Sequence, residues 1–492
     1  MDLGQSIRRG VKWLILGNTG QRALEFAFGV VLARLLVPAD FGLIVTVQVF
    51  TGFVGMLTSG GMGQALIRAK EVDKEDFDAV FTLQLVVGVL IYAGFYLIAP
   101  HFAAFFGEPI YEELLRVSTL TFLLRPFANM HTSWLNREMD FKTRTLISMV
   151  TGLVNGISSI LMAFAGLGVW SLVYAGLLGG VVRNVMLARA TPLKLRLNFD
   201  TRIVRRHAGF GFKVVANDLL GHLRREGVKL VLSKLAGPAF LGLYNKADSL
   251  HRLPYWTLGQ PLAQPLFRAM AKVQDNLDQT KYMYYRAVAL LMVYVMPFFV
   301  GFLWVAEPFI NFVYGPKWEA AGPPLAIMAT AGFFYIITRP CGAVMLAQNR
   351  LGWQMIAQGA TLVVTLVACV IGLRWGLEGA AWGWVASQVF AAAIHYWIIY
   401  RLLPTRLSDL GRALVPGLIL NGLLVVTLLL MDLWLGPHEA AHPLLYMLGM
   451  ASVGGLVYGA AFLLLPIPAL ATEVDRWTGL LNKAAERLLA RR

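Results

Sequence analysis

Long apolar runs separated by short polar segments follow one another along most of this chain. Most runs contain roughly 20 residues, the length that a helix needs to cross the hydrocarbon core of a bilayer. The pattern therefore predicts an all-α polytopic membrane protein with about 14 transmembrane helices. The predicted helices lie near residues 12–35, 41–67, 78–99, 113–134, 145–165, 169–189, 208–233, 240–263, 286–306, 322–347, 354–374, 379–402, 412–432 and 443–465.

The predicted helix at residues 208–233 carries a stripe of polar residues. Asp218, His222, Arg225 and Lys229 recur at spacings of four, three and four, which places them on one helix face. A charged side chain facing lipid costs on the order of 3 kcal/mol or more. We therefore expect this face to contact protein or a water-filled cavity. A hydropathy scan could overlook this helix and the first one, because they are the least apolar of the set.

The arrangement occurs twice, with an offset of 200 residues. Residues 32–43 align without a gap on residues 232–243, and the alignment extends back through the polar stripe. It pairs Asn18 with Asp218, Arg22 with His222, Glu25 with Arg225, and Gly29 with Lys229. We interpret the two helices as facing each other across a central cavity. The alternative is two structural helices whose charges pair locally, Arg22 with Glu25 and Asp218 with His222.

A second feature that recurs is an Arg-Pro pair inside a predicted helix. Arg125-Pro126 lies in the fourth helix and Arg339-Pro340 in the tenth, and an Asn-Arg pair follows each of them. Proline frees a backbone carbonyl and bends a helix, and bent helices near the midplane are places where substrate sites form. The alternative is a packing kink in which the arginine caps the freed carbonyls.

The charges expected in the cavity are mostly positive. The basic candidates are Arg22, Arg125, Arg224, Arg225, Lys229, Lys246, Arg252 and Arg339, against the acidic Glu25, Asp218 and Glu226. Guanidinium groups match the geometry of phosphate and carboxylate oxygens. The balance favours an anionic ligand, bound through the basic candidates, over an organic cation.

Composition and loop charge support a membrane protein. The chain is 57 % hydrophobic and only 14 % charged, where a soluble protein has about 25 % charged residues. The net charge of +15 first suggests nucleic acid, but Lys and Arg gather in alternate loops, as the positive-inside rule predicts. We therefore expect no nucleic-acid partner and place both termini in the cytoplasm.

No catalytic or metal-binding pattern emerges. The eight histidines are scattered, and the two cysteines, Cys341 and Cys369, lie in apolar runs. We predict no catalytic residue, no metal and no cofactor. The N-terminus lacks an apolar core followed by a cleavage site, so no cleavable signal is expected.

Residues 469–492 have the spacing of an amphipathic helix. They predict a basic surface helix on an anionic leaflet, with partner binding as the alternative.

Several short motifs together resemble one family. They are ARLLVPADFGL at 33–43, GMGQALIR at 61–68, LNREMDFKTR at 135–144, GLGVWSLV at 166–173 and GLEGAAWGWVASQ at 376–388. They are similar to polysaccharide transporters of the MOP superfamily, in particular to the Wzx-type flippases of the colanic-acid-exporter-like branch. The resemblance covers approximately residues 10–400.

The resemblance implies two pseudo-symmetric six-helix lobes around a central cavity, plus two accessory helices. We expect lobes at 1–203 and 204–404, accessory helices at 405–468, and the surface helix after them. It further implies a flippase in the bacterial inner membrane that translocates undecaprenyl-diphosphate-linked oligosaccharide for O-antigen, capsule or exopolysaccharide by alternating access. The polysaccharide polymerase and chain-length machinery are the expected partners. Glu25, Asp218 and Glu226 are candidates for coupling to Na⁺ or H⁺.

Three rival interpretations remain at this point. A multidrug exporter of the same superfamily should favour acidic residues in its cavity, where this chain favours basic ones. A membrane-embedded glycan polymerase or ligase should carry a large outer loop with catalytic groups, and the predicted outer loops are short. A purely structural role in a synthesis complex does not account for charges in the middle of the chain.

Overall fold

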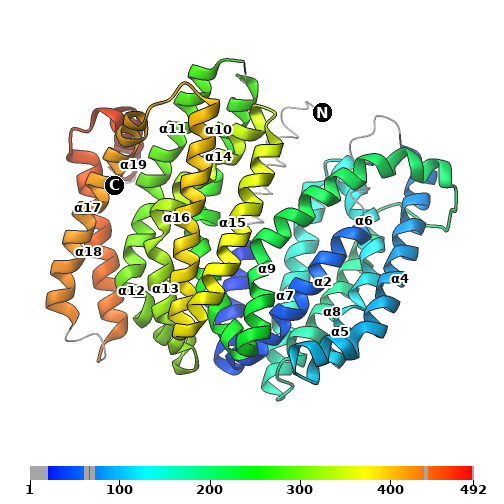
Figure 1. Cartoon of the computed structure of the whole chain (residues 1–492). Coiled ribbons are helices and arrows are strands. Elements are labelled where there is room, and N and C mark those ends of the chain that lie inside the picture. The colour runs from blue at the N-terminus through cyan, green and yellow to red at the C-terminus, as the bar shows by residue number, and fades with distance from the viewer. Residues whose placement is uncertain (1–19, 60–65, 67–71, 274, 437–440, 490–492) are drawn as a thin grey trace. The chain divides into compact units, whose positions relative to one another are not determined.

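The computed structural model describes residues 20–59, 66, 72–273, 275–436 and 441–489, and this part of the chain contains helices and no strand (Figure 1). Contacts between residues divide the chain into two compact units, residues 1–245 and 246–492. The expected boundary between the six-helix lobes, near residue 203, precedes this division. The beginning of the second repeat therefore packs with the first unit.

The described part of the first unit contains seven helical segments and the larger part of an eighth helix. They are a helix at residues 20–35, α2 (Pro38–Ser59), α4 (Lys74–Phe106), α5 (Ile110–Ser118), α6 (Thr121–Arg137), α7 (Phe141–Phe164), α8 (Trp170–Ala190), and α9 (Thr201–Pro254) as far as residue 245.

The second unit begins inside α9 and continues to the C-terminus. Its elements are the π-helix η1 (Tyr255–Gly259), α10 (Gln260–Lys272), α11 (Leu277–Tyr294), α12 (Met296–Tyr314), η2 (Pro316–Ala321), α13 (Gly322–Thr330), α14 (Gly332–Ala347), α15 (Leu351–Gly372), η3 (Leu373–Trp375), α16 (Gly376–Leu402), α17 (Leu407–Leu435), α18 (Pro443–Leu464), η5 (Pro468–Leu470) and α19 (Ala471–Leu489).

These helices confirm an all-α, multi-pass membrane protein. Within the described residues, eight helical stretches are long and apolar enough to cross a membrane, or nine if α13 and α14 count as one bent span. One of the eight, residues 351–402, contains two predicted spans. Residues 20–35 and α9 are not among these stretches: the described part of the first helix is shorter than a full span, and α9 carries the polar stripe. A total of about 14 spans is compatible with this set.

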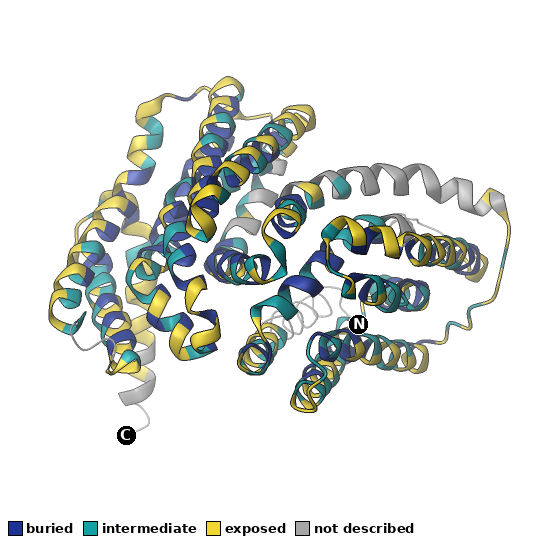
Figure 2. Ribbon diagram, turned by 60° about the horizontal axis from the view of Figure 1, so that its bottom comes forward, coloured by how far each residue is buried: buried dark blue, intermediate teal, exposed yellow. Residues whose placement is uncertain are grey.

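The surface of the helices has the character expected in lipid. Exposed and buried residues alternate around the helices (Figure 2). Large apolar side chains lie fully at the surface, among them Leu97 at 74 % and Leu433 at 79 % exposure. In water such a surface would aggregate, whereas in a bilayer it is the solvated face.

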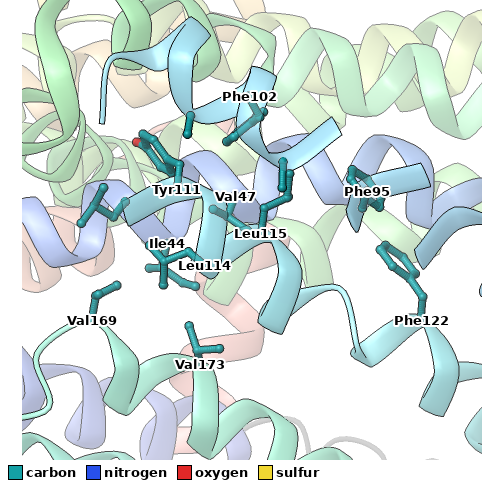
Figure 3. Packing of buried hydrophobic residues seen from close by; sticks show 13 residues of the cluster. Ile44, Val47, Phe95, Phe102, Tyr111, Leu114, Leu115, Phe122, Val169 and Val173 are labelled. Carbon is teal, nitrogen blue, oxygen red and sulfur yellow. The ribbon is translucent and has the colours of Figure 1, made fainter. Parts of the chain in front are cut away.

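The core of the first unit surrounds the short helix α5. Tyr111, Leu114 and Leu115 of α5 are fully buried and meet Val47 of α2 and Phe102 of α4 (Figure 3). Val169, the residue before α8, and Val173 of α8 close the same cluster. Helix α5 therefore holds α2, α4 and α8 together.

The 200-residue repeat is visible as a matched pair of helix breaks. Helicity stops at Leu36 and Val37 in the first copy and at Gly237, whose φ is 83°, in the second. A proline follows each break. A Cβ atom on Gly42 would lie 1.7 Å from the carbonyl oxygen of Pro238, and one on Gly242 would lie 1.9 Å from that of Pro38. Such reciprocal contacts between matched residues are what a local two-fold axis generates.

The two helices after the second repeat pack on the second unit. Leu424 and Leu428 of α17 and Met450 of α18 form a buried cluster with Val300 of α12. This packing accounts for α17 and α18 as accessory helices, as predicted.

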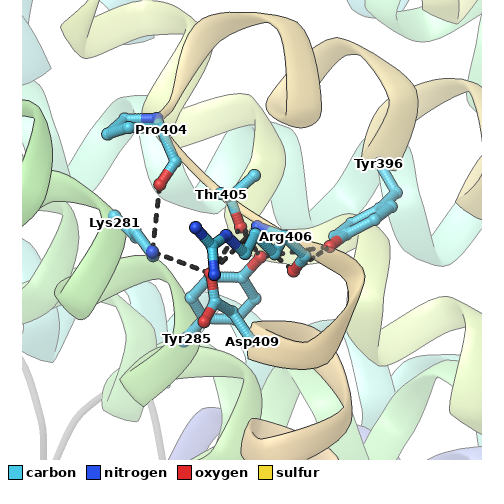
Figure 4. Close-up of polar contacts among 7 residues, drawn as sticks. All are labelled: Lys281, Tyr285, Tyr396, Pro404, Thr405, Arg406 and Asp409. Atoms are coloured by element: carbon cyan, nitrogen blue, oxygen red, sulfur yellow. Dashed lines mark hydrogen bonds and ion pairs between the residues drawn. The ribbon is translucent and has the colours of Figure 1, made fainter.

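A polar network fixes the chain where α17 begins (Figure 4). The Lys281 ammonium lies 2.7 Å from the Asp409 carboxylate and donates to the Pro404 carbonyl at 2.9 Å. The Tyr285 hydroxyl contacts those of Tyr396, at 3.1 Å, and Thr405. The network therefore ties the α16–α17 loop to α11.

The tail after residue 468 forms helix α19, which is attached at its first turns. Arg286 and Glu473 pair at 2.7 Å, and the Trp477 indole N–H donates to the Tyr294 hydroxyl at 2.9 Å. Leu480 and Leu481 remain about half exposed. Contact of this apolar edge with an anionic leaflet stays a prediction.

We expect Gly42→Ala to destabilise the protein, because the new methyl group would overlap the backbone of Pro238. Overpacking of this kind costs about 1–3 kcal/mol, so the midpoint of thermal unfolding in detergent should fall. Gly94→Ala is the matched control, since a Cβ atom there meets nothing within 4 Å. Equal thermal midpoints for the two variants would show that the close crossing of α2 and α9 is wrong.

Candidate functional site

Arg125 of α6 lies on an aromatic ring beside a glycine of α2. Its guanidinium carbon is 4.7 Å from the centroid of the buried Phe122 ring. A Cβ atom on Gly55 would lie 2.3 Å from its Nη1, so glycine is what leaves room for this side chain. The aromatic face stabilises the cation by about 0.5–2 kcal/mol and leaves the N–H donors at the edge of the guanidinium.

Arg339 of α14 has the same kind of support in the second unit. Its guanidinium carbon lies 3.7 Å from the Tyr335 ring centroid and 5.2 Å from that of Tyr255. The Nε atom is buried and has no hydrogen-bond partner. Within the described part of the chain, no carboxylate is within ion-pair distance of Arg125 or of Arg339.

The two Arg-Pro pairs thus share a local design. Each arginine precedes a proline inside its helix, and each rests on an aromatic ring one turn earlier, at i−3 for Arg125 and at i−4 for Arg339. Such an arrangement holds a cation in an apolar setting without a carboxylate partner among the described residues. Guanidinium groups of this kind can bind carboxylate or phosphate oxygens.

The expected bend at these prolines stays a prediction. Helices α6 and α14 continue through Pro126 and Pro340, and the helix breaks lie earlier, at Thr119–Leu120 and at Ala331, where α13 and α14 meet at 59°. For Pro126, the carbonyl that loses its partner belongs to Phe122. A Cβ atom on Gly88 of α4 would lie 2.7 Å from this oxygen, so α4 packs closely against this turn of α6.

The stripe on α9 is partly occupied by protein contacts. Lys229 is buried and pairs with Glu226 at 2.6 Å. The His222 ring lies edge-on to Phe53, and its Nε2 is 3.2 Å from the Val49 carbonyl oxygen, both on α2. Arg225 is exposed. The side chains of Asp218 and Arg224 lie outside the described part of the chain.

The first copy of the stripe is more exposed. Arg22 and Glu25 both lie at the surface of the first unit. The Gln21 amide donates to the Glu25 carboxylate at 2.8 Å. Asn18 lies outside the described residues. The ligand and coupling roles of Arg22 and Glu25 remain predictions.

Lys246 and Arg252 have partners within the second unit. The Lys246 ammonium lies 4.3 Å from the Tyr314 ring centroid and 4.5 Å from that of Trp318. Arg252 pairs with the buried Asp248 at 2.7 Å. A ligand would have to compete with these contacts, so the two residues are weaker candidates than Arg125 and Arg339. The sequence analysis did not name Asp248. It lies four residues before Arg252, a spacing that predicts an ion pair on a helix.

No cluster of three or more His, Cys, Asp or Glu side chains suitable for a metal occurs among the described residues. The known charge partners of the basic candidates are single carboxylates or aromatic rings. The arrangement can therefore bind and release an anion.

A buried polar cluster joins the two copies of the repeat. Thr46 of α2 and Ser233 of α9 bring their hydroxyl oxygens to 2.7 Å. The Tyr111 hydroxyl lies 3.0 Å from that of Thr46 and 3.3 Å from that of Ser233. Nearby, the Lys234 ammonium donates to the Phe105 carbonyl. We call Thr46, Tyr111 and Ser233 the clasp. The repeat alignment pairs Ser233 with Ala33 and Thr46 with Lys246. It therefore could not predict that the hydroxyl groups of the clasp contact one another.

The fold is that of a multi-pass membrane protein, and each unit holds the arginine of an Arg-Pro pair on an aromatic ring. Residues 31–323, more than half of the chain, match the polysaccharide biosynthesis protein family. The chain belongs to this family, and the predicted resemblance to polysaccharide transporters is confirmed.

Known relatives agree with this assignment. The succinoglycan biosynthesis transport protein ExoT of Rhizobium meliloti is 23 % identical, over 94 % of this chain and 93 % of ExoT. The lipopolysaccharide biosynthesis protein WzxC of Escherichia coli is 22 % identical, over 82 % of each chain. The lipid II flippase MurJ in an inward closed conformation has the same fold, with a TM-score of 0.73, 15 % identity, and coverage of 91 % of this chain and 97 % of MurJ.

We expect a disulfide to form between cysteines at positions 46 and 233 of the clasp. The 2.7 Å between the two hydroxyl oxygens brings the Cβ atoms within reach of disulfide geometry. The test uses Thr46→Cys/Ser233→Cys with the native Cys341 and Cys369 changed to Ala, mild oxidation, and mass spectrometry of peptides. Thr46→Cys/Ser158→Cys is the control, because the Ser158 hydroxyl bonds to the Val154 carbonyl of its own helix. Failure to crosslink in the folded protein would refute the clasp.

Proposed function

We propose that this protein is a flippase that moves undecaprenyl-diphosphate-linked oligosaccharide repeat units from the inner to the outer leaflet of the bacterial inner membrane. Its product would serve the assembly of O-antigen, capsule or exopolysaccharide. The observation that carries the proposal is the matched pair Arg125 and Arg339, each held on an aromatic ring without a carboxylate partner in the described structure.

The chemistry of the ligand follows from that pair. A diphosphate presents several oxygens, which guanidinium forks bind through two parallel hydrogen bonds. Acidic sugars present carboxylates of similar geometry. Arg22, Arg224 and Arg225 would add positive charge along the striped helices. The polyprenyl chain would stay in lipid and pass between the lobes.

Translocation would proceed by alternating access between the six-helix lobes at 1–203 and 204–404. An inside-negative potential favours outward movement of an anion, by about 2.3 kcal/mol per charge per 100 mV. With both termini in the cytoplasm, the basic loops would face the leaflet on which the substrate is made. Polysaccharide polymerase and chain-length machinery would take up the product on the other side.

The rival functions are less well supported. A multidrug exporter for organic cations would leave Arg125 and Arg339 without a counter-charge. The relative ExoT is named as a transport protein, which argues against a glycan polymerase or ligase. Family membership and the two unpaired arginines together favour the polysaccharide flippase.

Arg125→Ala and Arg339→Ala should each lower flipping of a polyprenyl-diphosphate oligosaccharide in proteoliposomes by tenfold or more, because a charge-assisted hydrogen bond contributes about 1.5–3 kcal/mol. Lys at either position should rescue only in part, since the planar fork is lost. Arg116→Ala is the control, because Arg116 also lies over a ring, at 4.5 Å from Tyr96, but has a carboxylate partner in Glu112. Normal flipping by both folded alanine variants would rule out the anion site.

Closing the clasp covalently should stop transport. In the oxidised Thr46→Cys/Ser233→Cys protein, α2 and α9 could not separate, so a cycle in which the two copies of the repeat move apart would halt. Reduction should restore the rate, and the Thr46→Cys/Ser158→Cys control should be insensitive to oxidant. Flipping at an unchanged rate in the fully crosslinked protein would contradict alternating access at this seam.

A further inference from the structure

Buried polar atoms without hydrogen-bond partners gather at one place in the second unit. Both ring nitrogens of His251, the Tyr335 hydroxyl and the Arg339 Nε atom lack a partner. Buried polar groups in folded proteins are nearly always paired, and each exception asks for an explanation such as a role in function. Because Tyr335 contacts both of the other residues, the three orphaned groups form one cluster.

His251 is enclosed by aromatic rings from three other helices. It belongs to α9 and is fully buried. Its ring centroid lies 4.9 Å from that of Phe299 on α12, 4.8 Å from Trp384 on α16 and 5.4 Å from Tyr335 on α14. Phe299 stacks on the imidazole, whereas Trp384 and Tyr335 stand nearly perpendicular to it. A cage of this composition attracts a cation and offers a neutral imidazole little hydrogen bonding.

Few charged groups act on this cage. On α9, the neighbours of His251 are Asp248 and Arg252, which pair at 2.7 Å. Helix α14 contributes Tyr335 and Arg339, and η1 contributes Tyr255, whose ring also lies beside Arg339. Helices α12 and α16 present Phe299 and Trp384. The Asp248–Arg252 pair is close to neutral, so Arg339 is the uncompensated charge of the cluster.

Opposing influences act on the charged form of His251. The stacked face of Phe299 and the carboxylate of Asp248 stabilise an imidazolium, whereas complete burial disfavours it and the guanidinium of Arg339 repels it. An anion bound to Arg339 would cancel this repulsion, because opposite charges in a medium of low dielectric screen each other strongly. Anion binding at Arg339 and proton binding at His251 would then reinforce each other, as linkage requires.

We infer that His251 is a proton-binding site that takes up one proton when an anionic head group binds at Arg339. The proton would come from water and reside on Nδ1 or Nε2, and the site would release it when the anion leaves. The inference rests on the proposed function and names H⁺ as the ion coupled to it. It assigns this role to a residue other than Glu25, Asp218 and Glu226.

The test is isothermal titration calorimetry of the purified full-length protein in detergent, with geranylgeranyl diphosphate as the probe. Titrations near neutral pH in buffers of different ionisation enthalpy give the number of protons taken up on binding. The diphosphate itself titrates, so the informative quantity is the difference between wild type and variant. We expect His251→Phe and His251→Gln to take up about one proton fewer than wild type.

His395→Phe is the matched control. His395 is also buried in the second unit, on α16, but its Nδ1 lies 2.7 Å from the Ala391 carbonyl oxygen. This variant should keep the wild-type proton uptake. Size-exclusion profiles establish folding, and the pair of His251 variants guards against failure of either one to fold.

The possible results separate this inference from the proposed function. Suppose that wild type binds the probe and that Arg339→Ala abolishes binding. If the His251 variants then keep the wild-type proton uptake, the assignment of the proton site to His251 is wrong, and the assignment of the anion site to Arg339 is retained. If wild type does not bind the probe, or Arg339→Ala binds it as wild type does, the anion site is wrong and the proton site with it.

Discussion

The cost of an ionised side chain in an apolar medium governs how this protein is built. A cation at the centre of a bilayer is unfavourable by several kcal/mol unless protein or water compensates it. Within the described structure, Lys229 and Arg252 are compensated by carboxylates, and Lys246 by two aromatic rings. Arg125 and Arg339 receive aromatic support alone. This difference in compensation distinguishes the two arginines on which the proposed anion site depends from Lys229 and Arg252.

The same constraint shapes the contact between the two copies of the repeat. Helices that must approach and later separate cannot be joined by a large apolar interface or by buried charges. Here α2 and α9 cross at Gly42 and Gly242, backbone against backbone, and three neutral hydroxyl groups pair beside the crossing. Such contacts are close but individually weak. The contact between α2 and α9 is therefore close and, in the described part of the chain, contains no buried charge at the crossing.

The cluster around His251 shows how the second unit differs from the first. Arg125 has a single aromatic neighbour, whereas Arg339 shares Tyr335 with a buried histidine. The repeat alignment pairs His251 with Thr51, a residue that does not titrate near neutral pH. The Arg-Pro pair therefore recurs in both halves, whereas the repeat places Thr51 where the second half has the buried His251.

The sequence by itself determined the class of protein, the repeat and the two arginines. Hydropathy, loop charge and the 200-residue offset are properties of chemical identity and spacing, and they persist whatever the packing. Tertiary structure decided which charges are compensated, because an ion pair such as Glu226–Lys229 or a ring beneath Arg339 depends on rotamers and neighbouring helices. It also decided that α4 packs closely against α6 at the Phe122 carbonyl, which Pro126 leaves without its helical partner. The clasp joins residues 187 positions apart, and only the folded chain brings them together.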